Sequence, residues 1–523
     1  MSQMHDDKKD QDFDFCSNEQ NDSSTMENSS TDDEKVDKFE HARPGPGGFA
    51  AGTQGHHDQN TPAQLPAQQS SHQTTENEGH SFFSNKLSPH RKNVFLKFCT
   101  INLVLIVFIL TTFSIYWGSY YDRNSRYKDL KMLVVIEDEQ VVEGVEPVFG
   151  PAMRSLLETP EAQSHGDWHI YSQSEYQRIA DEAGNSIDAE IADKVYRQIY
   201  WTSIHVKPNA TFNYRQALSE GNGDYNVTKN TVVTRFETGR DFMNMNQYIE
   251  PQLDAIEEMW LQLQPKLTKQ LVKNIAIDSE SKLDIVSRPM QFLKVDGSPW
   301  TETVLVAPCQ VGFIYMIILT SYVFNFYKNV HSFAAKSGVK RTHFIIYRYI
   351  CSIGTFFFIS LSFGLVTLAF QADFTVTYGK SGFLVYWAIA FLTVCAVGFA
   401  NEIMAMLLTT FYPPLLGCWV SFWVVINISP TFGPLALMSK FHRYGYAFPI
   451  HNSFNAVRTV FFDVYKGEMG RNIGILVAWW ALWTCLFPVV IVYTGNVSAR
   501  RAQAAAQAKQ QAEKEEKATK LEV

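Results

Sequence analysis

Cysteine is scarce in this chain, and the cysteines present are not spaced as a metal or disulfide site requires. The 523 residues include seven cysteines, with no CxxC pair and no Cys/His set at the spacing of zinc ligands. None lies between Cys99 and Cys309, and six stand in or beside long apolar runs. A cysteine in such a run is by default a small packing residue. We therefore expect neither a metal site nor a disulfide framework.

The motifs of soluble enzymes are missing as well. The chain has no HExxH, no G-x-S-x-G and no GxGxxG after a strand. The tripeptide Gly379-Lys-Ser381 resembles the end of a phosphate-binding loop, but Phe374 stands where that pattern requires its first glycine. We expect no catalytic residues, no cofactor and no nucleic-acid partner, and we do not expect an enzyme.

Charged residues are nearly absent from six long apolar segments. These segments cover residues 98–118, 309–327, 344–370, 383–407, 415–428 and 473–493. A helix needs roughly 20 mostly apolar residues to cross the hydrocarbon core of a bilayer. It must be a helix because lipid offers no partner for the backbone N–H and C=O groups. The pattern predicts an α-helical polytopic membrane protein with six transmembrane helices, one followed by five in a membrane domain at 309–494.

Basic residues predict the orientation of these helices. The loop 328–343 carries three lysines and Arg341 with no acid nearby, and Arg500 and Arg501 open the C-terminal tail. Cytoplasmic loops carry an excess of Lys and Arg. Both ends of the chain are therefore predicted to be cytoplasmic, which places residues 120–308 on the opposite side of the membrane.

Large apolar residues are few in the N-terminal 90 residues. Residues 1–80 hold 16 acidic and 5 basic side chains, a local net charge of −11, whereas the whole chain is −8. So polar a segment cannot bury enough surface to offset its conformational entropy. We predict a disordered acidic cytoplasmic tail over 1–90, and no signal peptide, because no apolar region follows Met1.

Residues 120–308 are long enough to form a domain of their own. Apolar and β-branched residues bounded by Gly, Pro and Asn predict strands at 132–137, 200–206 and 227–236. A narrow apolar stripe over 249–271 predicts a helix. We therefore expect an extracytoplasmic α/β domain inserted between the first and second transmembrane helices.

Two further features of this domain can be tested against a structure. Pro265 lies inside the predicted helix and should kink or split it. Asn209 and Asn226 each begin an Asn-X-Thr sequon in a turn-like stretch, so both are predicted glycosylation sites.

The stretch 430–465, before the last apolar segment, is neither a clean transmembrane helix nor an ordinary loop. Three prolines interrupt it, and an apolar helical face is bordered by basic and aromatic residues, which is typical of an amphipathic or re-entrant hairpin at the membrane interface. Contacts with lipid phosphates would relieve its basic charge. Its polar side chains either contact a substrate or anchor the hairpin, and the sequence leaves both roles open. The candidates are His442, Arg443, Tyr444, Tyr446, His451 and Arg458.

Glu402 lies toward the end of the predicted fourth transmembrane helix. Ionisable groups in lipid are costly and functional by default, so Glu402 is a candidate proton carrier on a substrate path. Its position near the cytoplasmic interface favours an exposed or capping carboxylate instead. Beyond the last span, residues 495–523 are rich in Ala, Gln, Glu and Lys, with Glu513 and Lys517 four residues apart. That pattern predicts a charged cytoplasmic helix.

The segment FHRYGYAFPIHNSFNAVRTVFFDVYKG at 441–467, with NISPTFGPLALMSK before it, resembles the fungal nitrosoguanidine-resistance protein family. The layout over about 90–495 is similar to the membrane half of ABC-2-type exporters, without an ATPase domain. The resemblance implies an export permease of the plasma membrane, or of the endoplasmic reticulum or another endomembrane. It would confer drug resistance and affect the distribution of phospholipids across the bilayer.

The resemblance also implies partners. They are membrane lipids, an amphipathic drug or lipid as substrate, a second copy of the chain, and a separate ATPase subunit, with an ion gradient as the other source of energy. An alternative function belongs to a different class. A membrane scaffold or sensor that transports nothing would use the outside domain to bind a partner and the acidic tail to signal.

Overall fold

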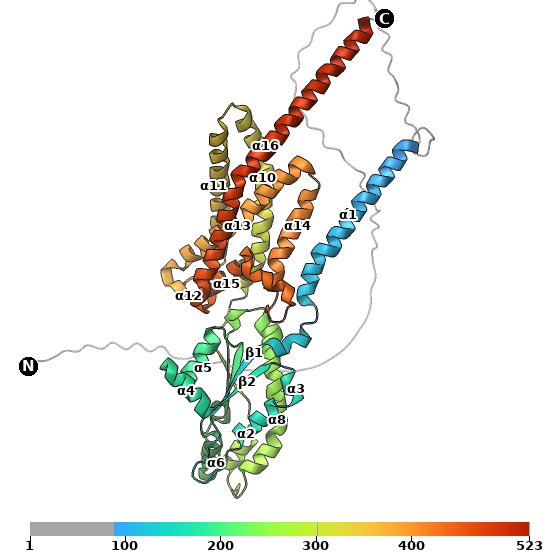
Figure 1. The fold of residues 1–523 in the computed structure, drawn as a ribbon. Helices are drawn as coiled ribbons and strands as arrows, with labels where there is room; N and C mark the ends of the chain where they lie inside the picture. The colour runs from blue at the N-terminus through green and yellow to red at the C-terminus, as the bar shows by residue number, and fades with distance from the viewer. Residues whose placement is uncertain (1–87, 301, 522–523) are drawn as a thin grey trace, which may run out of the picture. The chain divides into compact units, whose positions relative to one another are not determined.

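The computed structural model describes residues 88–300 and 302–521 (Figure 1). Nearly all of the predicted acidic tail, 1–90, lies outside the described residues. The described chain is a helical multi-pass membrane protein with a mixed five-stranded α/β domain after its first helix, which confirms the predicted fold class.

Five described helices are long and apolar enough to cross a membrane. They contain α1 (Ser88–Tyr120), α10 (Gly312–Lys336), α11 (Arg341–Ala369), α13 (Gly382–Phe411) and α16 (Met469–Leu521). The sixth predicted span is the shorter apolar helix α14 (Leu415–Ile428). Its 14 residues extend about 21 Å at 1.5 Å per residue, less than the roughly 30 Å of hydrocarbon.

Helix α13 is the core of the membrane domain. It packs against α10, α11, α14 and α16 and against α15 (Pro449–Phe462) (Figure 1). Of its 30 residues, 17 are buried. Helix α1 differs, because it contacts α14 but leaves most of its large apolar side chains exposed. An all-apolar exterior is stable only in an apolar solvent, as expected for a helix surrounded by lipid.

The sheet of the α/β domain has the strand order β2-β1-β3-β4-β5. Its first three strands are parallel, β4 runs antiparallel to β3, and β5 is parallel to β4. The strands are β1 (Lys131–Ile136), β2 (Asp167–Ser172), β3 (Thr202–Val206), β4 (Val232–Phe236) and β5 (Leu293–Asp296).

Helices cover both faces of this sheet, because successive side chains of a strand point to opposite sides. Met132 and Val134 of β1 pack in one core with residues of α2, α6 and α8. Leu133 and Val135 pack in a second core with residues of α4 and α5. These helices are α2 (Phe149–Leu157), α4 (Gln173–Ala183), α5 (Ile187–Tyr196), α6 (Ala210–Glu220) and α8 (Glu250–Leu271). Shorter helices of the same domain are α3 (Pro160–Gln163), α7 (Val227–Asn230) and α9 (Glu280–Ser287), whereas the short α12 (Thr375–Tyr378) belongs to the membrane domain.

Two of the three predicted strands are confirmed within two residues, as β1 and β3. The third, predicted over 227–236, is wrong at its beginning, because 227–230 form α7. The side chain of Asn226 accepts a hydrogen bond from the Lys229 N–H at 3.0 Å and caps this helix. The sequence pattern did not reveal β2, whose residues are mostly polar, or β5, which has only four residues.

Helix α8 is unbroken through Pro265, so this proline does not split the helix; the alternative, a kink, stays a prediction. A proline inside a helix costs about 3 kcal/mol. Buried side chains lie on both sides of it: Trp260, whose Nε1–H donates to the Met290 carbonyl at 3.0 Å, and Leu267. Their packing offsets the cost of Pro265. The predicted charged extension of the last span is confirmed, because α16 continues as one 53-residue helix to Leu521.

Candidate functional site: an arginine-lined cavity between the α/β domain and helix α15

The site is built on α15, the helix of the predicted hairpin. All but one of its 14 residues are buried, because it packs against α13, α14 and α16 and also against the turn η3 (Thr238–Arg240) of the α/β domain. The α/β domain covers the face of α15 that carries Arg458. The position of this helix relative to the lipid headgroups stays a prediction.

A glycine allows the α/β domain to approach α15 closely. A Cβ atom on Gly239 would lie 2.5 Å from the Cβ of Phe462 and 2.8 Å from the Ser298 carbonyl oxygen, so no other residue fits without movement. Beside it, the ring of Phe242 packs between those of Phe454 and Phe462, with centroid distances of 6.3 and 5.9 Å. The two parts of the chain thus share an apolar contact next to the polar cavity.

A cavity of about 200 Å³ lies at this junction. The α/β domain contributes Arg197, Gln198, Trp201, Arg240 and Asp241 to its lining. The membrane domain contributes Tyr446, His451, Phe454, Asn455, Arg458, Glu468 and Arg471, with residues of the 430–435 turn. Four arginines therefore face two acids across a small volume.

Arg240 is held rigidly on the domain side of the cavity. Its side chain is 7% exposed and donates to the carbonyl oxygens of Tyr200 at 2.6 Å and Gln198 at 3.1 Å, and its guanidinium lies 3.6 Å from the centre of the Trp201 ring. Burial, with the nearby positive charge of Arg458, lowers the pKa of Arg240 to about 9. Arg240 therefore remains a cation at neutral pH.

Arg458 and His451 have polar atoms without partners on the α15 side. Arg458 is 7% exposed, donates from Nη2 to Asn455 Oδ1 and lies over the Phe454 ring at 4.5 Å. Its Nε, and Nδ1 of the His451 ring, have no hydrogen-bond partner among the described residues. Leaving a buried donor unpaired costs about 1–3 kcal/mol, which makes this cavity a candidate ligand site.

The two acids of the cavity do not balance the charge of its four arginines. Asp241 accepts a hydrogen bond from Asn244 Nδ2 at 2.8 Å, and burial raises its pKa, although Arg458 opposes that shift. Glu468 pairs with Arg471 at 2.7 Å. The cavity has four guanidinium groups, two of them buried, and two carboxylates. This excess of positive charge suits an anion, and the planar fork of arginine matches phosphate and carboxylate oxygens.

The structure brings three of the predicted hairpin residues together at the cavity: Tyr446, His451 and Arg458. The other three predicted hairpin residues do not line it. His442 is buried, with its Nε2 2.9 Å from the Ile115 carbonyl oxygen of α1 and its Nδ1 3.0 Å from Ser439 Oγ, so it anchors η9 (Lys440–Ala447) to α1. Arg443 is exposed, and the Tyr444 ring packs on Phe448 with centroids 5.0 Å apart.

Glu402 lies outside the cavity, and the reading of it as an exposed or capping carboxylate is wrong. Its side chain is 1% exposed and accepts hydrogen bonds from Arg348 of α11 and from Ser352 Oγ. The pair forms because α11 and α13 pack together inside the membrane domain. The two predicted glycosylation sites, Asn209 and Asn226, are both exposed on the α/β domain, and their modification stays a prediction.

The sequence did not indicate the domain half of the cavity. Arg240 and Asp241 follow β4 and Trp201 precedes β3, more than 200 residues before Arg458. No local pattern marks them, because only the docking of the domain on α15 brings them together. Among the described residues, no group of three or more His, Cys, Asp or Glu side chains could hold a metal ion.

Comparison with known proteins finds a family and a relative that this chain resembles. The profile of DUF3533, described as a protein of unknown function, matches residues 101–485. A protein of Saccharomyces cerevisiae named as an uncharacterized endoplasmic reticulum membrane protein, YJR015W, is 36% identical over 438 residues, which cover 82% of this chain and 85% of that protein. No solved structure matches the chain.

Proposed function

This chain belongs to the DUF3533 family of membrane proteins, and we propose that it is a transporter-like protein that exports or redistributes an amphipathic molecule with a phosphate-bearing headgroup. The observation that carries the proposal is the arginine-lined cavity between the α/β domain and α15. Phospholipids are the substrate class that this cavity suits best.

The size and chemistry of the cavity support a headgroup rather than a whole lipid. Sites for drug-sized ligands enclose about 300–1,000 Å³, whereas this cavity encloses about 200 Å³. Phe454 lines it, and the apolar helices α13 and α16 pack on the other sides of α15. A phosphate group could occupy the cavity while the acyl chains remain among apolar side chains.

The proposal includes the cellular role implied by the resemblance of segment 441–467. The protein would raise tolerance to nitrosoguanidine-type drugs and would change the distribution of phospholipids across the plasma membrane. The name of the yeast relative makes the endoplasmic reticulum the second location to examine. A fluorescent fusion imaged beside markers of both membranes tests the location directly.

The energy source and the assembly state are also part of the proposal. A separate ATPase subunit would drive transport, and two copies of the chain would work together. Co-purification of the full chain under mild detergent, followed by identification of nucleotide-hydrolysing proteins and by mass measurement of the complex, tests both. A complex that contains one copy and no ATPase would oppose this part of the proposal.

The central experiment removes one cavity charge in living cells. The gene is deleted, and tolerance to nitrosoguanidine and labelling of outer-leaflet phosphatidylethanolamine are measured. We expect both to change, and we expect the wild-type gene to restore them. Arg458→Gln and Arg471→Gln should restore neither, because each removes a cation from the cavity.

Arg443→Gln is the matched control for this experiment. It removes the same charge at an exposed position outside the cavity, and Arg443 lies in the same hairpin as Arg458. We expect it to behave as the wild type at equal protein level. The proposal is wrong if deletion changes neither measurement, or if both cavity variants restore them as fully as Arg443→Gln does.

A second candidate function is a scaffold or sensor that transports nothing. The observation that favours it is the long charged helix α16, whose exposed part from Arg500 to Lys514 offers a surface to a partner. Truncating 1–85 or 503–523 separates the two functions. A transporter should keep its activity after either truncation, whereas a signalling scaffold should lose it.

A further inference from the structure

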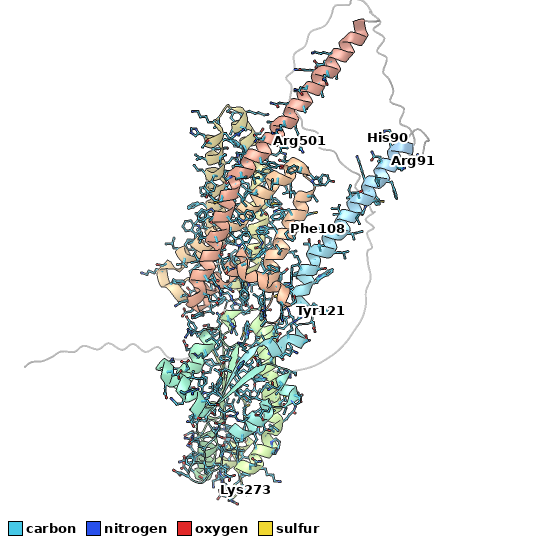
Figure 2. The ribbon with its side chains drawn as sticks, viewed as in Figure 1. His90, Arg91, Phe108, Tyr121, Lys273 and Arg501 are labelled. Carbon is cyan, nitrogen blue, oxygen red and sulfur yellow. The ribbon has the colours of Figure 1, made fainter. Side chains whose placement is uncertain are left out.

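A second cavity, of about 370 Å³, lies at the other end of the membrane domain. It is lined by the second half of α10, the first turns of α11, the end of α13 and the middle of α16. Figure 2 labels Arg501 on α16 at this end of the bundle, and Tyr121 at the opposite end, where α1 reaches the α/β domain. The loop between α10 and α11 closes the same end, which the distribution of basic residues predicts to be cytoplasmic.

The charges that line this second cavity are all of one sign. Lys328, Arg348 and Arg501 contribute three cations from three different helices, and its described lining includes no acidic residue. Lys328 and Arg501 are exposed, with Arg501 also donating to the Thr410 carbonyl. Like charges around one cavity repel one another, and a bound anion would relieve this repulsion.

Arg348 gives this cavity a fixed, buried cation. The side chain is 6% exposed, and its Nη2 donates to Glu402, which is held in turn by Ser352. Its Nε is buried without a hydrogen-bond partner among the described residues. Because Glu402 neutralises one of the three cations, the cavity keeps an excess of two positive charges.

The two cavities are separated by about the thickness of a bilayer core. Gln310 at the beginning of the α10 segment donates to the carbonyl of Thr431, which lines the first cavity. Lys328 on the same continuous segment lines the second cavity. Eighteen residues of helix extend about 27 Å at 1.5 Å per residue, close to the roughly 30 Å of hydrocarbon.

We propose that the second cavity is a binding site for a phosphate group at the predicted cytoplasmic face of the membrane. Apolar side chains share the lining with the cations: Phe324, Phe344, Met406 and Ile491. A site with cations beside apolar side chains suits a lipid phosphate with its acyl chains. A free phosphate ester has the same anionic chemistry, and the experiment distinguishes the two sources.

The test measures binding to the purified full chain in detergent. The probe is dihexanoyl phosphatidic acid, with dihexanoyl glycerol as the same chains without phosphate and inorganic phosphate as the headgroup without chains. We expect the wild type to bind two equivalents of the phosphatidic acid and none of the glycerol lipid. The double variant Lys328→Gln/Arg501→Gln should bind one equivalent, with the affinity of the other reduced at least tenfold, because it removes two cations that would pair with the phosphate.

Lys336→Gln is the matched control, because Lys336 is an exposed cation on α10 that does not line the cavity. It should bind like the wild type. Tight binding of inorganic phosphate, lost in the double variant, would assign the site to free phosphate. The proposal is overturned if the double variant still binds two equivalents, or if the glycerol lipid binds equally well.

The experiment also separates this proposal from the proposed function. Arg471→Gln lies at the first cavity and should remove the other equivalent of phosphatidic acid. If Arg471→Gln has no effect while Lys328→Gln/Arg501→Gln removes one equivalent, the first cavity is not a headgroup site and the second one is. The opposite result overturns the second site alone.

Discussion

The buried pair of Arg348 and Glu402 offers a sharp test of how the membrane domain is held together. Both side chains are almost completely buried, at 6% and 1% exposure, and Ser352 donates to the second oxygen of Glu402. Removing one partner of a buried pair leaves an uncompensated charge, which typically costs 3–5 kcal/mol. Glu402→Gln should therefore destabilise the protein by about that amount, because it leaves the Arg348 guanidinium unpaired.

Replacing both partners should be far less harmful than replacing one. The double variant Arg348→Met/Glu402→Leu keeps similar volumes and removes both desolvated charges, and such exchanges are often neutral or stabilising. The losses of unfolding free energy in the two single variants should therefore not add up in the double variant. The coupling energy between the two positions should be about 3 kcal/mol or more. Ser352→Ala should cost about 1 kcal/mol, since it removes one hydrogen bond to a carboxylate that Arg348 still holds.

The assay is the thermal midpoint of the purified full chain in one detergent. At about 1–2 °C per kcal/mol for a chain of this size, Glu402→Gln should lower the midpoint by about 3–10 °C, and the double variant by at most about 2 °C. Arg341→Gln, at an exposed position on the same helix α11, is the control and should change little. A wild-type midpoint in Glu402→Gln, or a double variant as unstable as the sum of the singles, would refute the reasoning.

Three further predictions concern the α/β domain. Gly239→Leu should loosen its contact with α15, because the new side chain would overlap Phe462, and limited proteolysis of the α/β domain should become at least several-fold faster. Burial raises the pKa of the Glu237 carboxyl from 4.5 to about 7. The proton on Glu237 therefore stabilises the folded chain by up to about 3 kcal/mol below pH 4.5, and this stability is lost as the pH rises through 7. Glu237→Gln should raise the thermal midpoint at pH 8 and not at pH 5. Burial alone would lower the pKa of His205, but hydrogen bonds to the carboxylates of Asp188 and Glu137 outweigh burial and raise this pKa. The protonated imidazole therefore stabilises the folded chain at low pH, and this stability is lost as the pH rises above about 6.5. In His205→Gln the thermal midpoint should not show this fall with pH.

Sequence patterns were sufficient where the local pattern of apolar residues determines the secondary structure. The apolar runs predicted the helices because lipid leaves the backbone no alternative. Strand β1 was visible because helices cover both faces of the sheet and its residues after Lys131 are all apolar. Strand β2 was missed, since its alternating Trp168 and Ile170 lie among polar residues. Its place beside β1 is set by pairing across more than 30 residues, which no local window contains.

The cavity could not be predicted for the same reason. Tyr446, His451 and Arg458 were candidates because they lie on one amphipathic segment, yet the sequence offered two surroundings for that segment, lipid headgroups or protein. In the structure this segment packs against protein, and the α/β domain approaches α15 closely at Gly239. Glu402 was misjudged because its partner Arg348 lies on another helix, 54 residues earlier, and no local pattern links the two.

The Nε of Arg458, which has no hydrogen-bond partner among the described residues, bears on the choice between transporter and scaffold. A scaffold needs only a stable junction between its α/β domain and the membrane helices, and an apolar side chain at that position would serve it better. A buried donor without a partner costs about 1–3 kcal/mol, and two arginines that face each other across a small cavity add repulsion. A site that binds and releases an anion needs this arrangement, because the ligand supplies the missing partner only while it is bound. Arg458→Met distinguishes the two functions: it should raise the thermal midpoint in either case, but only in a transporter should the gain in stability come with loss of phosphatidic acid binding at this cavity.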